Sequence, residues 1–197
     1  MKISVILGST RPGRVGERVA KWVMAGLEST PGVEAELIDL AEFDLPHFDE
    51  ELPPRGNRDR HPQPGVARYL RKLEDAEGVI IVTPEYNFSF PGVLKDALDF
   101  VAFEMHRKPV AIVSYGVVGG SRASQALKLA VNGTKAVVIP EAIAIVAPQD
   151  VIDVYGKFVG DTSNPYNLES SLAATIKELV WWAEIVSSAT RASKTHA

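Results

Sequence analysis

The sequence contains no cysteine. Disulfide bonds, thiolate zinc sites, iron–sulfur clusters and cysteine nucleophiles are therefore excluded, and any redox chemistry must come from a bound cofactor. Histidine is scarce too, and none of the four has another histidine three or four residues away: His47, His61, His106 and His196. We therefore expect no metal site. The chain also shows no nucleophile elbow, which argues against a hydrolase.

The chain has neither a basic excess nor a long apolar run. Lys and Arg number 21 against 25 Asp and Glu, which gives a formal net charge of −4. Nucleic-acid binders carry a basic face, so nucleic acid is not an expected partner. No stretch approaches the roughly 18 apolar residues of a membrane-spanning helix, and the apolar start at residues 1–7 is too short for a signal sequence. We expect a cytoplasmic protein with no membrane partner.

What the chain does contain is the balance of a globular protein. Of its 197 residues, 46% are hydrophobic and 23% are charged, which is enough apolar material for one full core. The length leaves no room for a second catalytic domain, and the chain shows no internal repeat, low-complexity tract or linker. We expect residues 1–197 to form a single domain.

Short β-branched runs alternate with longer helical patterns along the chain. This alternation predicts a parallel sheet covered by helices on both faces. Five strands are expected, at residues 2–7, 34–39, 79–83, 109–115 and 136–146, the last of them irregular between 139 and 142. Apolar spacings of one, three and four residues predict helices over 19–27, 94–101, 123–130 and 172–183.

Two segments do not fit a regular element. Residues 44–65 contain five prolines and two glycines, and residues 148–165 contain two of each. We expect both to be long loops, and long loops in compact domains are usually functional or mobile. The second segment is also a candidate for contact with a neighbouring subunit.

The loop after the first expected strand, residues 8–16, reads GSTRPGRVG. In an open α/β sheet, ligands bind beyond the carboxyl ends of the strands, so this loop lies at the expected ligand edge. Its glycines let backbone N–H groups approach a phosphate, its hydroxyls and arginines donate hydrogen bonds, and the following helix start favours an anion. It matches neither the nucleotide-hydrolase P-loop nor G-x-G-x-x-G. The alternative is a plain glycine-rich turn.

Two further loops at the same edge have a ligand-like composition. Residues 84–87, after the third strand, read PEYN, and the alternative here is an exposed turn with an interfacial aromatic. Residues 114–122, after the fourth strand, read SYGVVGGSR, whose glycines allow close approach to a flat ligand. The alternative is that Gly119 and Gly120 only begin a helix. Three such loops together favour one common site.

Three motifs stand in a specific order and spacing: GSTR at 8–11, PEYN at 84–87 and PGxLKxAxD at 91–99. Together they resemble the NADPH-dependent FMN reductase family over about residues 1–146. That family includes flavin-dependent quinone, azo-dye and chromate reductases. The resemblance implies an α/β, flavodoxin-like fold, with a doubly wound five-stranded parallel sheet of strand order 2-1-3-4-5 and helices on both faces.

The resemblance also implies an FMN site shared by the three loops. Ser9, Arg11 and the backbone around residues 14–16 would hold the phosphate, while Tyr86 and Asn87 would position the ring. The expected FMN-binding residues are Ser9, Arg11, Arg14, Val15, Gly16, Pro84, Glu85, Tyr86, Asn87, Ser114, Tyr115, Gly116, Gly119 and Gly120. Many family members have a serine and an asparagine late in the phosphate loop, where this chain has GRVG. Arg14 therefore either binds the phosphate or faces solvent.

The implied activity is that of an NAD(P)H-dependent oxidoreductase. Hydride would pass from the nicotinamide to FMN and then to a small acceptor: a quinone, an azo compound, free flavin or a metal oxyanion. FMN would carry the chemistry, with no obligatory protein general acid. The alternatives are a flavodoxin-like electron carrier and a flavin-binding sensor without turnover. A homodimer or homotetramer is expected, with Phe88, Phe90, the helix at 91–103 and the loop at 44–65 as interface candidates.

Overall fold

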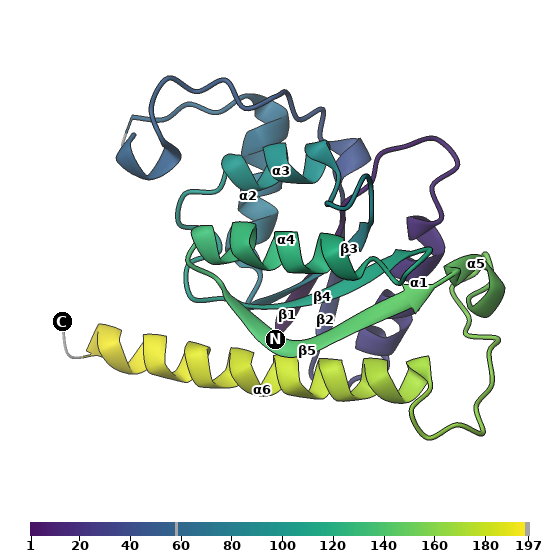
Figure 1. Ribbon diagram of the computed structural model, residues 1–197. Coiled ribbons are helices and arrows are strands. Elements are labelled where there is room, and N and C mark those ends of the chain that lie inside the picture. Colours follow the sequence, from purple (N-terminus) through teal and green to yellow (C-terminus); the bar gives the residue numbers. More distant parts are fainter. Residues whose placement is uncertain (58, 196–197) are drawn as a thin grey trace.

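A five-stranded parallel sheet forms the centre of the computed structural model, which describes residues 1–57 and 59–195 (Figure 1). The strands are β1 (Lys2–Leu7), β2 (Glu34–Asp39), β3 (Gly78–Pro84), β4 (Pro109–Gly116) and β5 (Val137–Val146). They lie in the order β2-β1-β3-β4-β5, and every pairing is parallel. The doubly wound α/β fold and its strand order are thus confirmed.

The central strands are buried on both faces of the sheet. All seven residues of β3 are buried, as are seven of the eight in β4. Alternate side chains serve two different cores: Val79 and Ile81 pack on one side, Ile80 and Val82 on the other. Burial on both faces explains why these strands are continuous apolar runs in the sequence rather than alternating patterns.

Helices cover each face of the sheet. The core of one face contains side chains of α1 (Gly16–Glu28) and α6 (Leu168–Thr195). The core of the other face contains side chains of α2 (Pro64–Asp75), α3 (Gly92–Asp99) and α4 (Ser121–Gly133), and Figure 1 shows these helices across the sheet from α6. No helix within residues 1–57 and 59–195 has the length and hydropathy needed to cross a membrane.

The helix α2 was not identified from the sequence. It begins at Pro64, within the last two residues of the loop expected over residues 44–65. Pro64 occupies the first helical turn, where its missing N–H does not break a hydrogen bond. The buried residues Val66, Tyr69, Leu70 and Leu73 follow at spacings of three, one and three. A short 3-10 helix, η2 (Pro54–Gly56), also interrupts the segment, and η1 (Leu40–Glu42) precedes it. The expectation of one continuous loop was therefore wrong at these places.

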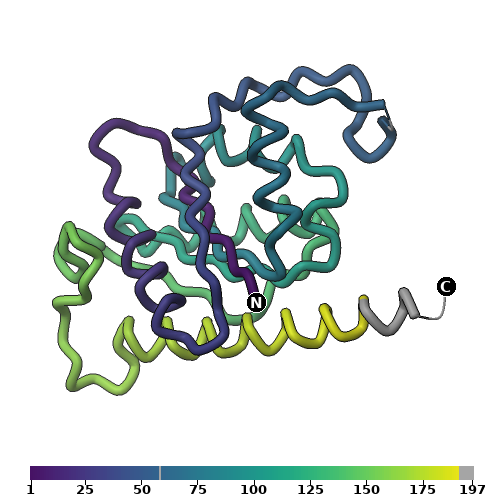
Figure 2. Tube along the Cα trace, turned by 180° about the vertical axis from the view of Figure 1, so that it is seen from behind, coloured from purple at the N-terminus to yellow at the C-terminus, as the bar shows by residue number. Residues whose placement is uncertain are grey.

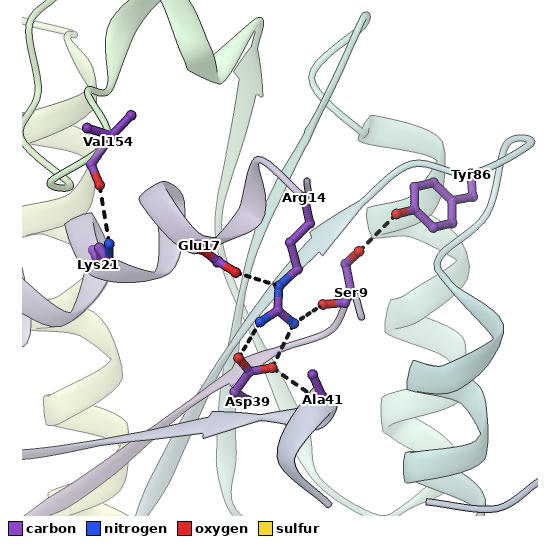
Figure 3. Close-up of polar contacts among 8 residues, drawn as sticks. All are labelled: Ser9, Arg14, Glu17, Lys21, Asp39, Ala41, Tyr86 and Val154. Carbon is purple, nitrogen blue, oxygen red and sulfur yellow. Dashed lines mark hydrogen bonds and ion pairs between the residues drawn. The ribbon is translucent and has the colours of Figure 1, made fainter. Parts of the chain in front are cut away.

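The second expected loop, residues 148–165, is partly ordered by contacts with α1. It begins with the short helix α5 (Pro148–Val151) and closes an antiparallel bridge between Ile152 and Phe158. Arg18 of α1 donates to the Ile152 carbonyl at 3.0 Å, and Lys21 donates to the Val154 carbonyl at 3.3 Å (Figure 3). Figure 2 shows the segment running from α5 to α6 beside α1.

The irregularity expected in the fifth strand is present. The register of β5 on β4 shifts between two pairs, Val110 with Val138 and Ile112 with Ala142. Pro140 lies in the displaced stretch, and proline has no N–H to donate to a sheet ladder. The shift lets β5 continue to Val146, so that its carboxyl end reaches the same edge as the other strands.

Lys108 gives the fold a measurable pH dependence. Its Nζ donates to the carbonyls of Leu73 at 2.6 Å and Glu74 at 2.7 Å, which closes the carboxyl end of α2. Burial lowers the pKa of Lys108 from 10.5 to about 8, although nearby carboxylates such as Glu74 oppose the shift. Between these two values the unfolded chain binds the additional proton, so this group makes the free energy of unfolding rise with pH.

We expect the difference in free energy of unfolding between the wild type and Lys108→Met to grow in favour of the wild type from pH 8 to pH 10. Urea denaturation of both proteins at pH 7, 8, 9 and 10 measures this difference. Methionine keeps the unbranched apolar stem and removes the titrating amine. The difference measured at pH 7 therefore serves as the reference for the higher pH values. A difference that stays constant over this range contradicts the prediction.

Candidate active site

A cavity of about 500 Å³ lies at the carboxyl edge of the sheet. This size falls within the range of about 300–1,000 Å³ typical of small-molecule sites, and the edge is where doubly wound folds bind their ligands. The lining residues come from the loops after four strands: Arg11, Arg14, Val15, Pro84, Glu85, Tyr86, Tyr115, Gly116, Val117, Val146, Ala147, Pro148 and Gln149. Most of them are apolar or aromatic, with arginines on one side.

The loop of residues 8–16 connects β1 to α1 and opens onto the cavity. Gly8 ties it to the sheet by donating its N–H to the Val82 carbonyl at 2.9 Å. Gly13 has a φ of +68°, and a side chain there would meet nothing within 4 Å, so the backbone at this turn is open. No side chain caps the start of α1 at Val15. The helix start therefore carries no side-chain cap, and its dipole favours a nearby anion.

Ser9 and Tyr86 join this loop to the one after β3. The Ser9 hydroxyl lies 2.8 Å from the Tyr86 hydroxyl, and Ser9 is fully buried (Figure 3). The guanidinium carbon of Arg11, from the loop of residues 8–16, lies 5.8 Å from the centre of the Tyr86 ring. Tyr86 thus contacts both a hydroxyl and a cation of the first loop while it lines the cavity.

The Arg14 guanidinium is bound by carboxylates and does not face solvent. Its guanidinium pairs with both oxygens of Asp39, at 2.7 Å for Nη1 to Oδ1, and Nη1 also donates to the Ser9 carbonyl (Figure 3). Its Nε donates to Glu17 at 3.1 Å. Only 10% of the Arg14 side chain is exposed. The Asp39 carboxylate raises the pKa of the guanidinium, against the opposing effect of burial.

The PEYN motif forms a two-residue hairpin turn. Tyr86 and Ser89 exchange both backbone hydrogen bonds, at 2.8 and 3.0 Å, and the two residues between them have positive φ, 47° for Asn87 and 67° for Phe88. Both values fit the tight turn that suits a right-handed hairpin twist. Asparagine adopts this conformation readily, whereas a bulky residue seldom does. The turn leaves Phe88 66% exposed and directs Tyr86 to the cavity.

Glu85 connects the second loop to the third. Its carboxylate accepts the Arg122 backbone N–H at 3.1 Å and pairs with the Arg122 Nε at 2.9 Å, so it caps the start of α4 from outside the helix. The Arg122 guanidinium carbon lies 4.0 Å from the centre of the Phe88 ring. The carboxylate is mostly buried, with 11% of the side chain exposed, whereas 46% of Arg122 is exposed.

We expect a graded loss of stability at Glu85. Glu85→Gln keeps an oxygen for the α4 amide but loses the charge, and should lower the free energy of unfolding by about 0.5–1 kcal/mol. Glu85→Ala also removes the helix cap, for a total of about 1–2 kcal/mol. Urea denaturation measures both values. Equal losses for the two variants would show that the cap contributes nothing.

Tyr115 forms the floor of the cavity beside the start of α1. A side chain on Gly16 would place its Cβ only 2.4 Å from the Tyr115 hydroxyl, so the helix start and the phenol are in direct contact. Burial raises the pKa of Tyr115 and Tyr86 adds to the rise, while the charges of Arg14 and Arg11 oppose it. The phenol is therefore a neutral hydrogen-bonding group at physiological pH.

The structure places eight of the fourteen expected residues on the cavity wall: Arg11, Arg14, Val15, Pro84, Glu85, Tyr86, Tyr115 and Gly116. The other six do not line the cavity: Ser9, Gly16, Asn87, Ser114, Gly119 and Gly120. Asn87 is exposed in the hairpin turn, whereas the other five are buried. Ser114, for example, is buried and donates to the Gly119 carbonyl at 2.8 Å, which holds the third loop in shape.

A fourth loop, not identified from the sequence, also lines the cavity. Val117 lies within the third loop but was not among the expected binding residues. The other missed lining residues end β5 or follow it: Val146, Ala147, Pro148 and Gln149. Ala147 has a φ of +42°, an unusual value for a residue with a side chain, and it turns the chain into α5. No glycine or charged motif marks these residues. Their position after a strand was the available signal.

These residues fit a flavin mononucleotide. At one end, the open turn at Gly13, the uncapped start of α1 and the Arg11 guanidinium supply donors and positive charge for a phosphate. Toward the other loops, Pro84, Tyr86 and Tyr115 offer flat or apolar surface for a ring. A protein with a parallel α/β sheet and this site at the carboxyl edge belongs to the flavodoxin-like, mononucleotide-binding class.

Comparison with known proteins specifies the family within that class. The model of the NADPH-dependent FMN reductase family matches residues 1–150, and the chain belongs to this family. It is similar to the NAD(P)H-dependent FMN reductase C4B3.06c of Schizosaccharomyces pombe, with 35% identity over 151 residues, 77% of this chain and 76% of the relative. The NADPH azoreductase of Bacillus sp. OY1-2 is 30% identical over 168 residues, 84% and 85% of the two chains.

A solved structure agrees. The flavoenzyme NAD(P)H:acceptor oxidoreductase FerB of Paracoccus denitrificans superimposes with a TM-score of 0.72 and 25% identity, over 93% of this chain and 97% of that one. Family membership confirms the resemblance of the three motifs. The chain is therefore an FMN-dependent NAD(P)H oxidoreductase.

Proposed function

We propose that the cavity binds FMN and that the protein uses it to pass reducing equivalents from NAD(P)H to a small acceptor: a quinone, an azo compound, free flavin or a metal oxyanion. Bound FMN would supply the hydride and electron chemistry. One observation carries the proposal: the Ser9–Tyr86 contact, 2.8 Å long, joins an open phosphate-type loop to the wall of a ring-sized cavity.

The side chains would bind and orient the cofactor. Arg11 and the start of α1 would take the phosphate, because they combine a guanidinium charge with the positive end of the helix dipole. Tyr86 and Tyr115 would contact the ring, and the lack of a side chain at Gly116 would leave room for a flat ligand. Asn87 would act through the turn, since it does not line the cavity.

The experiment is anaerobic reduction followed by an acceptor panel. The purified protein should be yellow, should release FMN on denaturation, and should bleach when NADPH or NADH is added alone. A quinone, an azo dye, free FMN or chromate should then restore the colour. A preparation that binds no FMN contradicts the proposal.

The same experiment separates the alternatives. An electron carrier would bind FMN but would stay oxidised with NAD(P)H until a reductase was added. A flavin-binding sensor would show no steady turnover on any acceptor, whether or not NAD(P)H bleached its flavin. Comparing the rates with NADPH and NADH also gives the nucleotide preference.

We propose in addition that the protein is a homodimer or homotetramer. Several large apolar side chains at or beside the cavity are exposed, among them Phe88 at 66%, Val117 at 93% and Val146 at 59%. Exposed apolar side chains in such number around a cavity favour a covering surface. Light scattering coupled to gel filtration measures the mass, and a monomer at micromolar concentration would contradict this.

A further inference from the structure

Arg14 lies in the loop of residues 8–16 and borders the cavity, yet its guanidinium is hydrogen-bonded to other groups of the protein. An arginine has five N–H groups. Nε binds Glu17, Nη1 binds Asp39 and the Ser9 carbonyl, and Nη2 binds Asp39 (Figure 3). Four hydrogen bonds are thus already made within the protein. A guanidinium engaged in this way has little capacity left for a phosphate.

The partner of Arg14 is itself fixed by the sheet. Asp39 is the last residue of β2 and stands in register with Leu7, the last residue of β1. Its Oδ1 also accepts the Ala41 N–H at 3.0 Å, and the residue is 9% exposed. A two-oxygen pairing with a planar guanidinium sets direction as well as distance. The Asp39 carboxylate therefore holds the Arg14 guanidinium in a fixed orientation.

The other end of the contact is the turn that would carry the phosphate. Arg14 reaches the Ser9 carbonyl, five residues earlier in the same loop, and so closes the loop on itself. The Ser9 hydroxyl then contacts Tyr86 at 2.8 Å. A continuous series of contacts runs from the end of β2, through Arg14 and Ser9, to the cavity wall.

We propose that Arg14 is a positioning residue for the FMN phosphate. It fixes the loop of residues 8–16 through Asp39 and Ser9 and does not itself bind the phosphate. This inference rests on the proposed FMN site. Asp39 neutralises Arg14, so within this fully described loop Arg11 is the arginine without a carboxylate partner and provides the charge for the anion.

The Asp39→Asn variant separates this role from direct binding. A positioning role predicts weaker FMN binding, because the amide cannot hold the guanidinium by two charged bonds. A direct phosphate ligand predicts the opposite, because the variant frees Arg14 and removes a negative charge beside the site. The two interpretations therefore differ in the sign of the effect.

The measurement is the dissociation constant of the apoprotein for FMN and for riboflavin, by quenching of flavin fluorescence. We expect Asp39→Asn and Arg14→Gln each to weaken FMN binding by about tenfold, since preorganisation of the loop is lost. Riboflavin has no phosphate, so its affinity should change by less than about threefold. Glu17→Gln is the matched control: Glu17 also pairs with Arg14 but is 56% exposed, and this variant should leave both constants within about twofold.

Each outcome is decisive. If Asp39→Asn binds FMN as tightly as the wild type or more tightly, the positioning role is wrong. If FMN and riboflavin weaken equally, Arg14 supports the whole fold and the inference also fails. Circular dichroism reports folding, and Asp39→Asn alone suffices if Arg14→Gln does not fold. A wild-type protein that binds no FMN would instead overturn the proposed function.

Discussion

Replacing Gly120 with alanine is expected to lower the free energy of unfolding by about 2–5 kcal/mol. Gly120 precedes α4 in the left-handed conformation, with a φ of +71°, which costs a residue with a side chain about 1–2 kcal/mol. The added Cβ would also lie 2.7 Å from the Tyr115 nitrogen and 2.8 Å from its carbonyl oxygen. Both contacts are with backbone atoms of β4, so the strand or the helix start must move, at a further cost of about 1–3 kcal/mol.

Gly13 offers a matched control for Gly120. It has nearly the same φ, +68°, but a Cβ there would meet nothing within 4 Å. Gly13→Ala should therefore show the conformational cost alone, about 1–2 kcal/mol. Urea denaturation of both variants isolates the cost of the contact. If the two variants lose equal stability, close packing of the third loop against Tyr115 does not matter and the description of this wall is wrong.

The strands could be predicted from the sequence because burial on both faces leaves a visible pattern. The run Val79-Ile80-Ile81-Val82 has no polar residue, and β3 extends it by one residue at its start and two at its end. The helix α2 was missed for the opposite reason. Only four of its twelve residues are buried, and prolines at its start drew attention to a loop. The spacing of those four residues is nevertheless that of an amphipathic helix.

The site was predictable where local chemistry marks it. Glycines and arginines identified the loop at 8–16, and the PEYN motif identified the second loop. The residues after β5 carry no such mark, although the irregularity of β5 beside Ile112 was expected from the sequence. The pairing of Arg14 with Asp39 joins residues 25 positions apart. It follows from strand order, because β2 lies next to β1 and their last residues are in register.

The second large effect is expected at Gly16, where the start of α1 meets Tyr115. Alanine would place its Cβ 2.4 Å from the Tyr115 hydroxyl and 2.9 Å from Leu7 Cδ1. We expect Gly16→Ala to lose about 1–3 kcal/mol of stability and at least about tenfold in FMN affinity, because either the phenol or the helix amides must shift.

Tyr115→Phe tests the cause of that loss, since it removes only the hydroxyl oxygen. Without that oxygen, the nearest atom of the ring is Cζ, at 3.2 Å from the added Cβ, and the tip of the Leu7 side chain can move. The double variant should therefore recover most of the stability and FMN affinity that Gly16→Ala loses. A double-mutant cycle from urea denaturation and flavin titration gives the coupling energy, which should be at least about 1 kcal/mol. Additive losses would place the effect of Gly16 elsewhere, in the backbone of the loop itself. A strong coupling would show that the helix start and the phenol form one wall, so that the phosphate end and the ring end of the cavity are positioned together.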